Sequence, residues 1–272
     1  MPKPRKSPVI EVSRYHSLLE KVFFDHYKAG DREVMFERNE LVTAAKALKI
    51  QLPKNLGDVV YSVRYRTALP HRIVATQPAG LEWVIEGAGR SLYAFRLSAA
   101  NRIVPNLQLA TIKIPDSTPE IVSAYALSDE QALLAVVRYN RLIDVFLGVA
   151  AYSLQSHLRT SVSGIGQIEI DEIYIGLDRG GRQYVIPVQA KGGSDRLGAT
   201  QAKQDIACCA AKFPGLICRA VSAQFIEEDL IALFELVLEG DELKVAAEAH
   251  YRLVPADAIS AEELASYSRR KA

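Results

Sequence analysis

The spacing of apolar residues in the N-terminal part of the chain predicts three helices. Over 12–29, apolar side chains recur three and four positions apart, as they do on one face of a helix, and Gly30 follows as a stop. Similar patterns predict helices over 38–50 and 55–69, separated by a short turn that contains Pro53.

A β-hairpin is expected next, because strand-forming runs at 81–86 and 91–97 flank a glycine-rich turn. Two helices joined by a short turn and followed by a hairpin are in the order of a winged helix-turn-helix, whose second helix enters the major groove of DNA. In this interpretation 55–66 is the recognition helix. The alternative is a small helical domain whose basic residues only face solvent. The candidate DNA contacts are Lys54, Ser62, Arg64, Arg66 and, on the wing, Arg90.

Three prolines between 101 and 119 indicate a connecting segment. We place a domain boundary there, between a winged-helix-like domain over 1–105 and a second domain over 106–272.

The net charge of the chain is only +1, but residues 41–72 hold six basic side chains against a single acid. A basic stretch of this kind can neutralise DNA phosphates.

In the second domain, a capping-box pattern at Ser128 and Gln131 precedes an apolar run. It predicts a long helix, broken near Gly148, that extends to about Thr160. Beyond this helix we expect strands at 167–177 and 183–190, a helix at 201–212, a strand at 215–222, a hairpin from 231–237 and 243–249, and a short terminal helix. The fold class is therefore α/β, with a mixed sheet flanked by helices.

Composition describes a globular chain without a membrane segment. Of the 272 residues, 49% are hydrophobic and 24% are charged, which is ordinary for a folded domain. The chain has no run of about 18 apolar residues, as a transmembrane helix requires, and its N-terminus leads into no apolar signal core. We therefore expect a cytoplasmic protein with no membrane partner. The three cysteines lack the spacing of a zinc site.

Two of the expected strands carry the residues with the clearest chemistry. The first contains Asp171, and the second ends in Gln189-Ala190-Lys191. Side chains alternate across a strand, so Gln189 and Lys191 share one face, and Asp171 can lie beside them across the hairpin. Such oxygen ligands suit Mg²⁺, which can activate a water to attack a phosphodiester, and Lys191 can stabilise the developing charge. The alternative is a structural salt bridge between Asp171 and Lys191.

At these residues the chain resembles the PD-(D/E)xK nuclease superfamily, which includes type II restriction endonucleases, Holliday-junction resolvases and repair nucleases. The resemblance covers about 128–222 and follows the family's order of a helix, an acid-bearing strand, a lysine-bearing strand, a helix and a further strand. It implies that Asp171 is the first acid, Gln189 the second metal-binding position and Lys191 the catalytic lysine. The implied metal ligands are Asp171, Gln189 and Ala190.

Gln189 departs from the family pattern, which usually has a carboxylate at this position. An amide oxygen is uncharged and is a weaker ligand for Mg²⁺, so we expect a nearby acid to complete the site. Gln201 and Gln204, on the helix that follows, resemble the polar helix residue that assists the site in several of these nucleases. The candidate acids are Glu172, Glu169 and Asp144.

The resemblance implies an Mg²⁺-dependent endonuclease that acts on double-stranded DNA, with Mn²⁺ able to replace Mg²⁺. A chain with its own reader domain best fits a type II restriction endonuclease, an analogy that also implies a homodimer and a cognate DNA methyltransferase acting on the same site. Two alternatives stay open. One is a repair or junction-resolving nuclease of the same superfamily, and the other is a DNA-binding regulator whose nuclease-like domain has lost activity.

Overall fold

The structure is a computed structural model in which two units are distinguished. The first comprises Met1–Asn101 and Ser161–Gln167, and the second comprises Arg102–Thr160 and Ile168–Ala272. Side chains are described from residue 14 onward, with that of residue 99 left aside. The described residues are 8–53, 56–57, 59–60, 63, 68–99, 103–125, 130–163, 165–192, 197–240 and 242–269.

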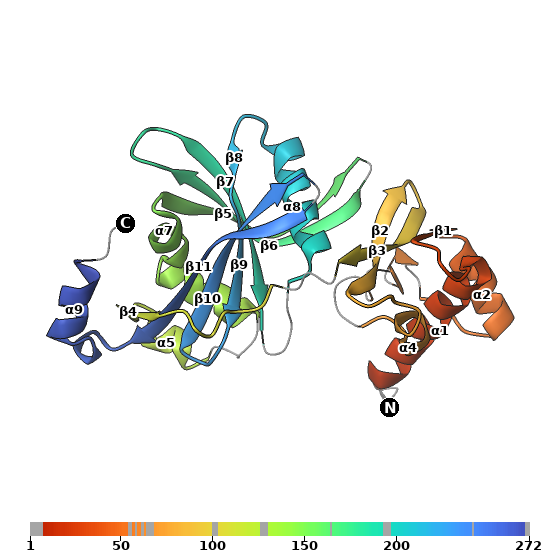
Figure 1. Ribbon diagram of the computed structural model, residues 1–272, viewed down its shortest axis with the longest axis horizontal. Helices are drawn as coiled ribbons and strands as arrows, with labels where there is room; N and C mark the ends of the chain where they lie inside the picture. Colours follow the sequence, from red (N-terminus) through yellow and green to blue (C-terminus); the bar gives the residue numbers. More distant parts are fainter. Residues whose placement is uncertain are drawn as a thin grey trace, which may run out of the picture. The chain divides into compact units, whose positions relative to one another are not determined.

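The first unit combines helices with a small antiparallel sheet (Figure 1). Within the described residues, the strand order of this sheet is β1-β3-β2, and Phe36 of β1 lies opposite Tyr93 of β3. Residues 57, 59, 60 and 63 are also helical. The elements are α1 (Pro8–His26), β1 (Glu33–Glu37), α2 (Glu40–Leu48), α4 (His71–Val74), β2 (Leu81–Gly89) and β3 (Leu92–Ala99).

Aromatic side chains form the core of the first unit. Phe23, on the inner face of α1, has no exposed surface and meets Trp83 and Phe95 edge-on, with ring centroids 5.2 and 5.0 Å away. Edge-on contacts of this kind add to the stabilisation from hydrophobic burial. The indole N–H of Trp83 donates to Thr76 Oγ1 (2.8 Å), so the polar end of this buried ring is also satisfied.

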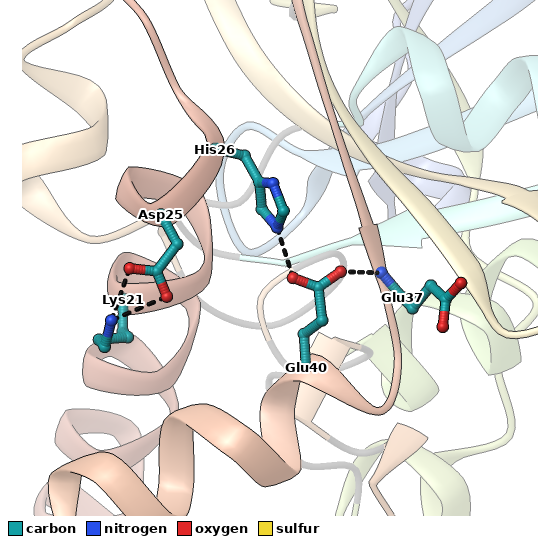
Figure 2. Close-up of polar contacts among 5 residues, drawn as sticks. All are labelled: Lys21, Asp25, His26, Glu37 and Glu40. Atoms are coloured by element: carbon teal, nitrogen blue, oxygen red, sulfur yellow. Dashed lines mark hydrogen bonds and ion pairs between the residues drawn. The ribbon is translucent and has the colours of Figure 1, made fainter.

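Figure 2 shows the polar contacts that connect α1 with α2. His26, the last residue of α1, points at the carboxylate of Glu40, and the other oxygen of Glu40 accepts the backbone N–H of Glu37 (2.7 Å). Lys21 and Asp25 pair along α1 at 2.5 Å. Glu40 therefore joins the ends of α1 and β1 to the first turn of α2, where a carboxylate is also favoured by the helix dipole.

A glycine in β2 explains why residues 161–167 belong to the first unit. A Cβ atom built on Gly87 would lie 2.2 Å from the carbonyl oxygen of Ile165. Ile165 lies in the turn between strands β5 (Ala150–Val162) and β6 (Gly166–Leu177). This turn approaches the β2 backbone so closely that only glycine fits at position 87.

A large mixed sheet forms the centre of the second unit. Within the described residues it has eight strands, in the order β4-β11-β10-β9-β7-β6-β5, with β8 beside β7. Strand β4 is parallel to β11 and β9 is parallel to β7, whereas the β6–β7, β9–β10 and β10–β11 pairs are antiparallel. The elements other than β5 and β6 are β4 (Thr111–Pro115), α5 (Glu120–Ser123), α6 (Glu130–Tyr139), α7 (Leu142–Leu147), β7 (Gln183–Lys191), α8 (Ala199–Lys212), β8 (Ile217–Cys218), β9 (Ala220–Phe225), β10 (Leu230–Glu239), β11 (Glu242–Val254), η1 (Ala256–Ala258) and α9 (Ala261–Tyr267).

Helices cover both faces of this sheet. On one face, Leu133 and Val137 of α6 pack in a cluster with Val188 of β7. On the other face, Ala202 of α8 packs in a cluster with Phe234 of β10. Because strand side chains alternate, each central strand sends every second side chain toward α6 and α7 and the others toward α8.

The predicted mixed α/β fold, with a large sheet flanked by helices, is confirmed. The long helix expected to reach Thr160 is wrong, because α7 ends at Leu147, Gly148 follows as its C-cap with a left-handed φ of 66°, and Ala150–Val162 is strand β5. Leu154 and Leu158 imitate one face of a helix, but glycine at Gly148 ends the helix and the serine, threonine, tyrosine and valine that follow do not favour one. Strand β1 has no counterpart among the expected elements.

The remaining expectations for the fold divide in two. The strands and the helix expected between 167 and 249 are present, with ends that differ by a few residues. Ser128, the first residue of the expected capping box, lies outside the described residues, as does most of the expected recognition helix. Over the described part of the chain, no helix has both the length and the apolar character needed to cross a membrane.

Candidate active site

Strands β6 and β7 carry the candidate site at the end of their shared ladder. The antiparallel register ends with Glu172 opposite Val188. Next to this pair, the backbone N–H of Ala190 donates to Asp171 Oδ2 (2.9 Å). The N–H and C=O of one residue in a strand point to the same side, so the Ala190 carbonyl also faces β6. Asp171 is therefore held by a backbone donor of β7.

The two neighbouring acids of β6 point to opposite faces of the sheet. Asp171 shares the α8 face with Gln189 of β7, as strand alternation requires, and the charge of Lys191 acts on Asp171 from the end of β7. Glu172 lies on the α6 face, where it is fully buried and its Oε1 accepts a hydrogen bond from Arg138 Nε (2.9 Å). The structure thus brings Asp171, Gln189 and Lys191 together, and it places Glu172 apart from them.

Two side chains of α8 hold Gln189. Its Nε2 donates to Asp205 Oδ2 (2.9 Å) and to the Glu169 carbonyl oxygen (3.1 Å), and its Oε1 accepts from Gln201 Nε2 (2.7 Å). Gln201 and Asp205 are four positions apart and so lie on one face of the helix. A carbonyl oxygen can only accept, which fixes the orientation of the Gln189 amide.

Lys191 ends strand β7 and pairs with an acid from α6. Its Nζ lies 3.3 Å from Glu130 Oε1, and only 12% of the Lys191 side chain is exposed. Glu130 is the first residue of α6, a position at which the helix dipole favours a carboxylate. The ammonium group is therefore held in place rather than free in solvent.

Carboxylates outnumber cations around Asp171. Burial raises the pKa of Asp171 against the opposing effect of Lys191. Burial and the charge of Asp171 raise the pKa of Glu169. The Glu169 carboxylate also pairs with Arg159, with Nη2 3.0 Å from Oε1. Burial also raises the pKa of Asp205 well above its ordinary value. The protein alone disfavours these ionised carboxylates, and a bound cation would reverse this imbalance.

The oxygen donors at this position suit a cation that takes few protein ligands. Within the part of the chain that the structure describes, no three Asp, Glu, His or Cys side chains are arranged to hold a metal ion. The available donors are the Asp171 carboxylate, the Ala190 carbonyl and the Gln189 amide oxygen. Mg²⁺ keeps several waters and is usually bound through one or two carboxylates. One carboxylate and two neutral oxygens therefore fit Mg²⁺.

The other candidate residues lie apart from this cluster or outside the described residues. Asp144 accepts the backbone N–H of Ala151 (3.0 Å) and pairs with Arg141, so it connects α7 with β5. Gln204 is buried on α8. Arg90 is exposed in the β2–β3 turn. The candidate DNA contacts that lie outside the described residues are Lys54, Ser62, Arg64 and Arg66.

Two residues of the cluster, Asp205 and Glu130, are absent from the sequence-based candidates. Each has a signal in the sequence. Asp205 follows Gln201 by four positions and so shares its helical face, and Glu130 stands just before the apolar run of α6. The missing information is which face of α8 packs on the sheet, because this depends on contacts between elements far apart in the sequence.

Comparisons of the chain with models of protein families, with curated proteins and with solved structures find no match. The geometry of the cluster around Asp171 and Lys191 is therefore the basis for a functional argument.

Proposed function

We propose that the protein is an Mg²⁺-dependent endonuclease that cleaves double-stranded DNA. One observation carries the proposal: Asp171 and Gln189 lie on one face of β6 and β7, and the charge of Lys191 acts on Asp171 from the end of β7, among carboxylates that outnumber the cations. Hydrolysis of a phosphodiester requires an activated water and positive charge beside the phosphate. A carboxylate, two neutral oxygens and a held lysine meet both requirements.

Each residue has a stated role in this proposal. Asp171, the Ala190 carbonyl and the Gln189 amide oxygen would hold the cation. The bound cation would lower the pKa of a coordinated water and so supply the attacking hydroxide. Lys191, which Glu130 holds from α6, would orient this water and stabilise the charge that develops on the phosphate oxygens.

The first unit is proposed to read the DNA. Its order of a helix, a strand, a helix, the helical residues 57, 59, 60 and 63 and the β2–β3 hairpin is compatible with a winged helix-turn-helix. The exposed Arg90 on the hairpin would contact the phosphate backbone. We further propose, by analogy, a type II restriction enzyme that acts as a homodimer, uses Mn²⁺ in place of Mg²⁺ and is accompanied by a methyltransferase for the same site.

Cleavage of plasmid and phage DNA in the presence of Mg²⁺, with a chelator as the negative control, tests the proposal. We expect discrete fragments from the wild-type protein, and none from Asp171→Asn or Lys191→Met. Two matched variants control for loss of the same side-chain types elsewhere. Asp178→Asn changes an acid in the β6–β7 turn, and Lys113→Met removes a lysine that pairs with Glu263 (2.8 Å); both should cleave normally.

The outcomes separate the alternatives. Undiminished cleavage by both Asp171→Asn and Lys191→Met would show that the site is wrongly assigned. Cleavage of branched DNA without sequence preference would replace the restriction enzyme by a repair or junction nuclease. DNA binding without cleavage in Mg²⁺ or Mn²⁺ would leave a regulator, and the proposed enzymatic function would be wrong.

A further inference from the structure

We infer that Asp205 of α8 is a positioning residue of this site that supplies the negative charge that strand position 189 lacks. The inference rests on the proposed function, because it assumes that the site binds a divalent cation. Gln189 and Asp205 form one buried pair: the amide donates to Oδ2 at 2.9 Å, and the two residues are 1% and 2% exposed.

The surroundings of Gln189 explain why an amide, rather than a carboxylate, is compatible with Asp205. A glutamate at this position would place its oxygens against the Asp205 carboxylate and the Glu169 carbonyl, both of which only accept hydrogen bonds. Two buried carboxylates at such a distance cannot both stay ionised. The amide donates where a carboxylate would be repelled, so the acid can stand on the helix only if the strand residue is neutral.

A purely structural role does not account for the charge of Asp205. Its Oδ1 is buried and has no hydrogen-bond partner among the described residues; the same holds for Oγ of Ser222 and for Oε2 of Glu172, but Glu172 is paired with Arg138. Ser222 lies opposite Gln189 in the β7–β9 ladder. A buried carboxylate with an unpaired oxygen is costly, and asparagine would form the same hydrogen bond to Gln189 without that cost. The charge is useful if it strengthens the attraction for a cation next to Asp171.

Gln201 completes the arrangement from the same helix. Its Nε2 donates to Gln189 Oε1 (2.7 Å), so α8 holds both ends of the amide. Residues that fix and polarise the groups around a metal ion affect its binding without contacting it, and their loss typically weakens metal affinity about 10- to 100-fold.

The variant Asp205→Asn tests the inference, because it keeps the shape and the hydrogen bond but removes the charge. We expect the affinity for Mg²⁺, measured by isothermal titration calorimetry, to fall about 10- to 100-fold. The thermal midpoint of the cation-free protein should stay constant or rise, because a buried charge has been removed. A merely structural role predicts the opposite, a lower midpoint with unchanged affinity.

A second variant reverses donor and acceptor. Gln189→Glu alone brings two carboxylates together and should weaken folding. In Gln189→Glu/Asp205→Asn one carboxylate again faces one amide, although the hydrogen bond to the Glu169 carbonyl is lost. We therefore expect partial recovery, with Mg²⁺ bound more tightly by the double variant than by either single variant.

The results distinguish failure of this inference from failure of the proposed function. If the wild-type protein binds Mg²⁺ and cleaves DNA, but Asp205→Asn binds Mg²⁺ equally well, the role of Asp205 is overturned and the nuclease stands. The same conclusion follows if Asp205→Asn does not fold or if the double variant binds no better than the single variants. If the wild-type protein neither binds Mg²⁺ nor cleaves DNA, both fail.

Discussion

Asp171 and Glu172 are adjacent on strand β6 but face different halves of the second unit. Glu172 is fully buried toward α6, where its Oε1 accepts from Arg138 Nε (2.9 Å) and from Ser153 Oγ (2.5 Å). Asp171 faces α8, accepts one backbone N–H and has the carboxylates of Glu130 and Asp205 within electrostatic range. One acid has its charge balanced by the protein, and the other does not.

This difference separates a structural acid from a functional candidate. A buried carboxylate that is paired with a cation adds little net stability, but it becomes costly when the cation is removed. A cluster of carboxylates that raise one another's pKa is unfavourable from the start, and such clusters are concentrated at sites that bind ligands or carry out chemistry. Removing charge should therefore have opposite effects on stability on the two sides of β6.

The largest expected effect is on catalysis at Asp171. We expect Asp171→Asn to lower the DNA cleavage rate about 10³-fold, because both cation binding and water activation are impaired. The free energy of unfolding of the cation-free protein should not fall, since a destabilising charge has been removed. Cleavage rates, compared with those of Asp178→Asn, and urea unfolding curves, compared with those of the wild-type protein, provide the measurements. A variant that loses both activity and stability would place Asp171 in the same structural class as Glu172.

The next largest effect is expected on the other face. Arg138→Met leaves Glu172 buried without its cation, and we expect the free energy of unfolding to fall by about 3 kcal/mol, the low end for buried pairs, because Arg138 is 43% exposed. The double variant Arg138→Met/Glu172→Met should regain most of this loss. Urea unfolding gives both values. Equal destabilisation of the single and double variants would contradict the pairing argument.

Strand periodicity alone predicts part of the contrast between Asp171 and Glu172. Alternation along β7 predicts that Gln189 and Lys191 share a face; in the structure Gln189 lies against α8, and Lys191, at the end of the strand, pairs with Glu130 of α6. The same rule places Glu172 on the opposite face from Asp171, which makes Glu172 the least suitable of the candidate acids. Local periodicity therefore carries enough information to sort side chains between the two faces of a strand.

Contacts between elements that are far apart in the sequence cannot be predicted from periodicity. Asp205 and Glu130 reach the site only because α8 and α6 pack on opposite faces of the sheet. Strand β5 shows the complementary problem, because Leu154 and Leu158 have helical spacing in an exposed edge strand. A spacing of four between apolar residues indicates a helix only if their side chains pack in the core. Leu154 is 55% exposed, so its spacing from Leu158 carries no such information.

The third prediction concerns the pH dependence of stability without divalent cations. Glu169, Asp171 and Asp205 have raised pKa values in the folded chain, so the folded state binds more protons than the unfolded state above about pH 4. Stability should therefore decline as the pH rises through the folded pKa values. Asp171→Asn should reduce this decline, and Mg²⁺ should offset it. Unfolding curves from about pH 5 to about pH 8 test this, and a rise in stability over this range would contradict it.

The smallest effect on the free energy of unfolding is expected in the first unit, where the exposed pairs serve as a reference for the buried pair. The side chains of His26 and Glu40 are 42% and 34% exposed, and exposed pairs contribute about 0.2–1 kcal/mol. We expect His26→Ala to lower the free energy of unfolding of the first unit by at most about 1 kcal/mol, since Glu40 keeps its bond to the Glu37 N–H. Lys21→Ala, which breaks the exposed pair with Asp25, should cost about 0.3–0.5 kcal/mol.

These two values set the scale against which Arg138→Met is judged. All three variants remove one partner of an ion pair or charged hydrogen bond, but only Arg138→Met leaves a carboxylate with no exposed surface. Urea unfolding of the three variants under one set of conditions isolates the contribution of burial. If Arg138→Met costs no more than His26→Ala, then the buried position of Glu172 carries no additional penalty, and the contrast between the two faces of β6 rests on Asp171 alone.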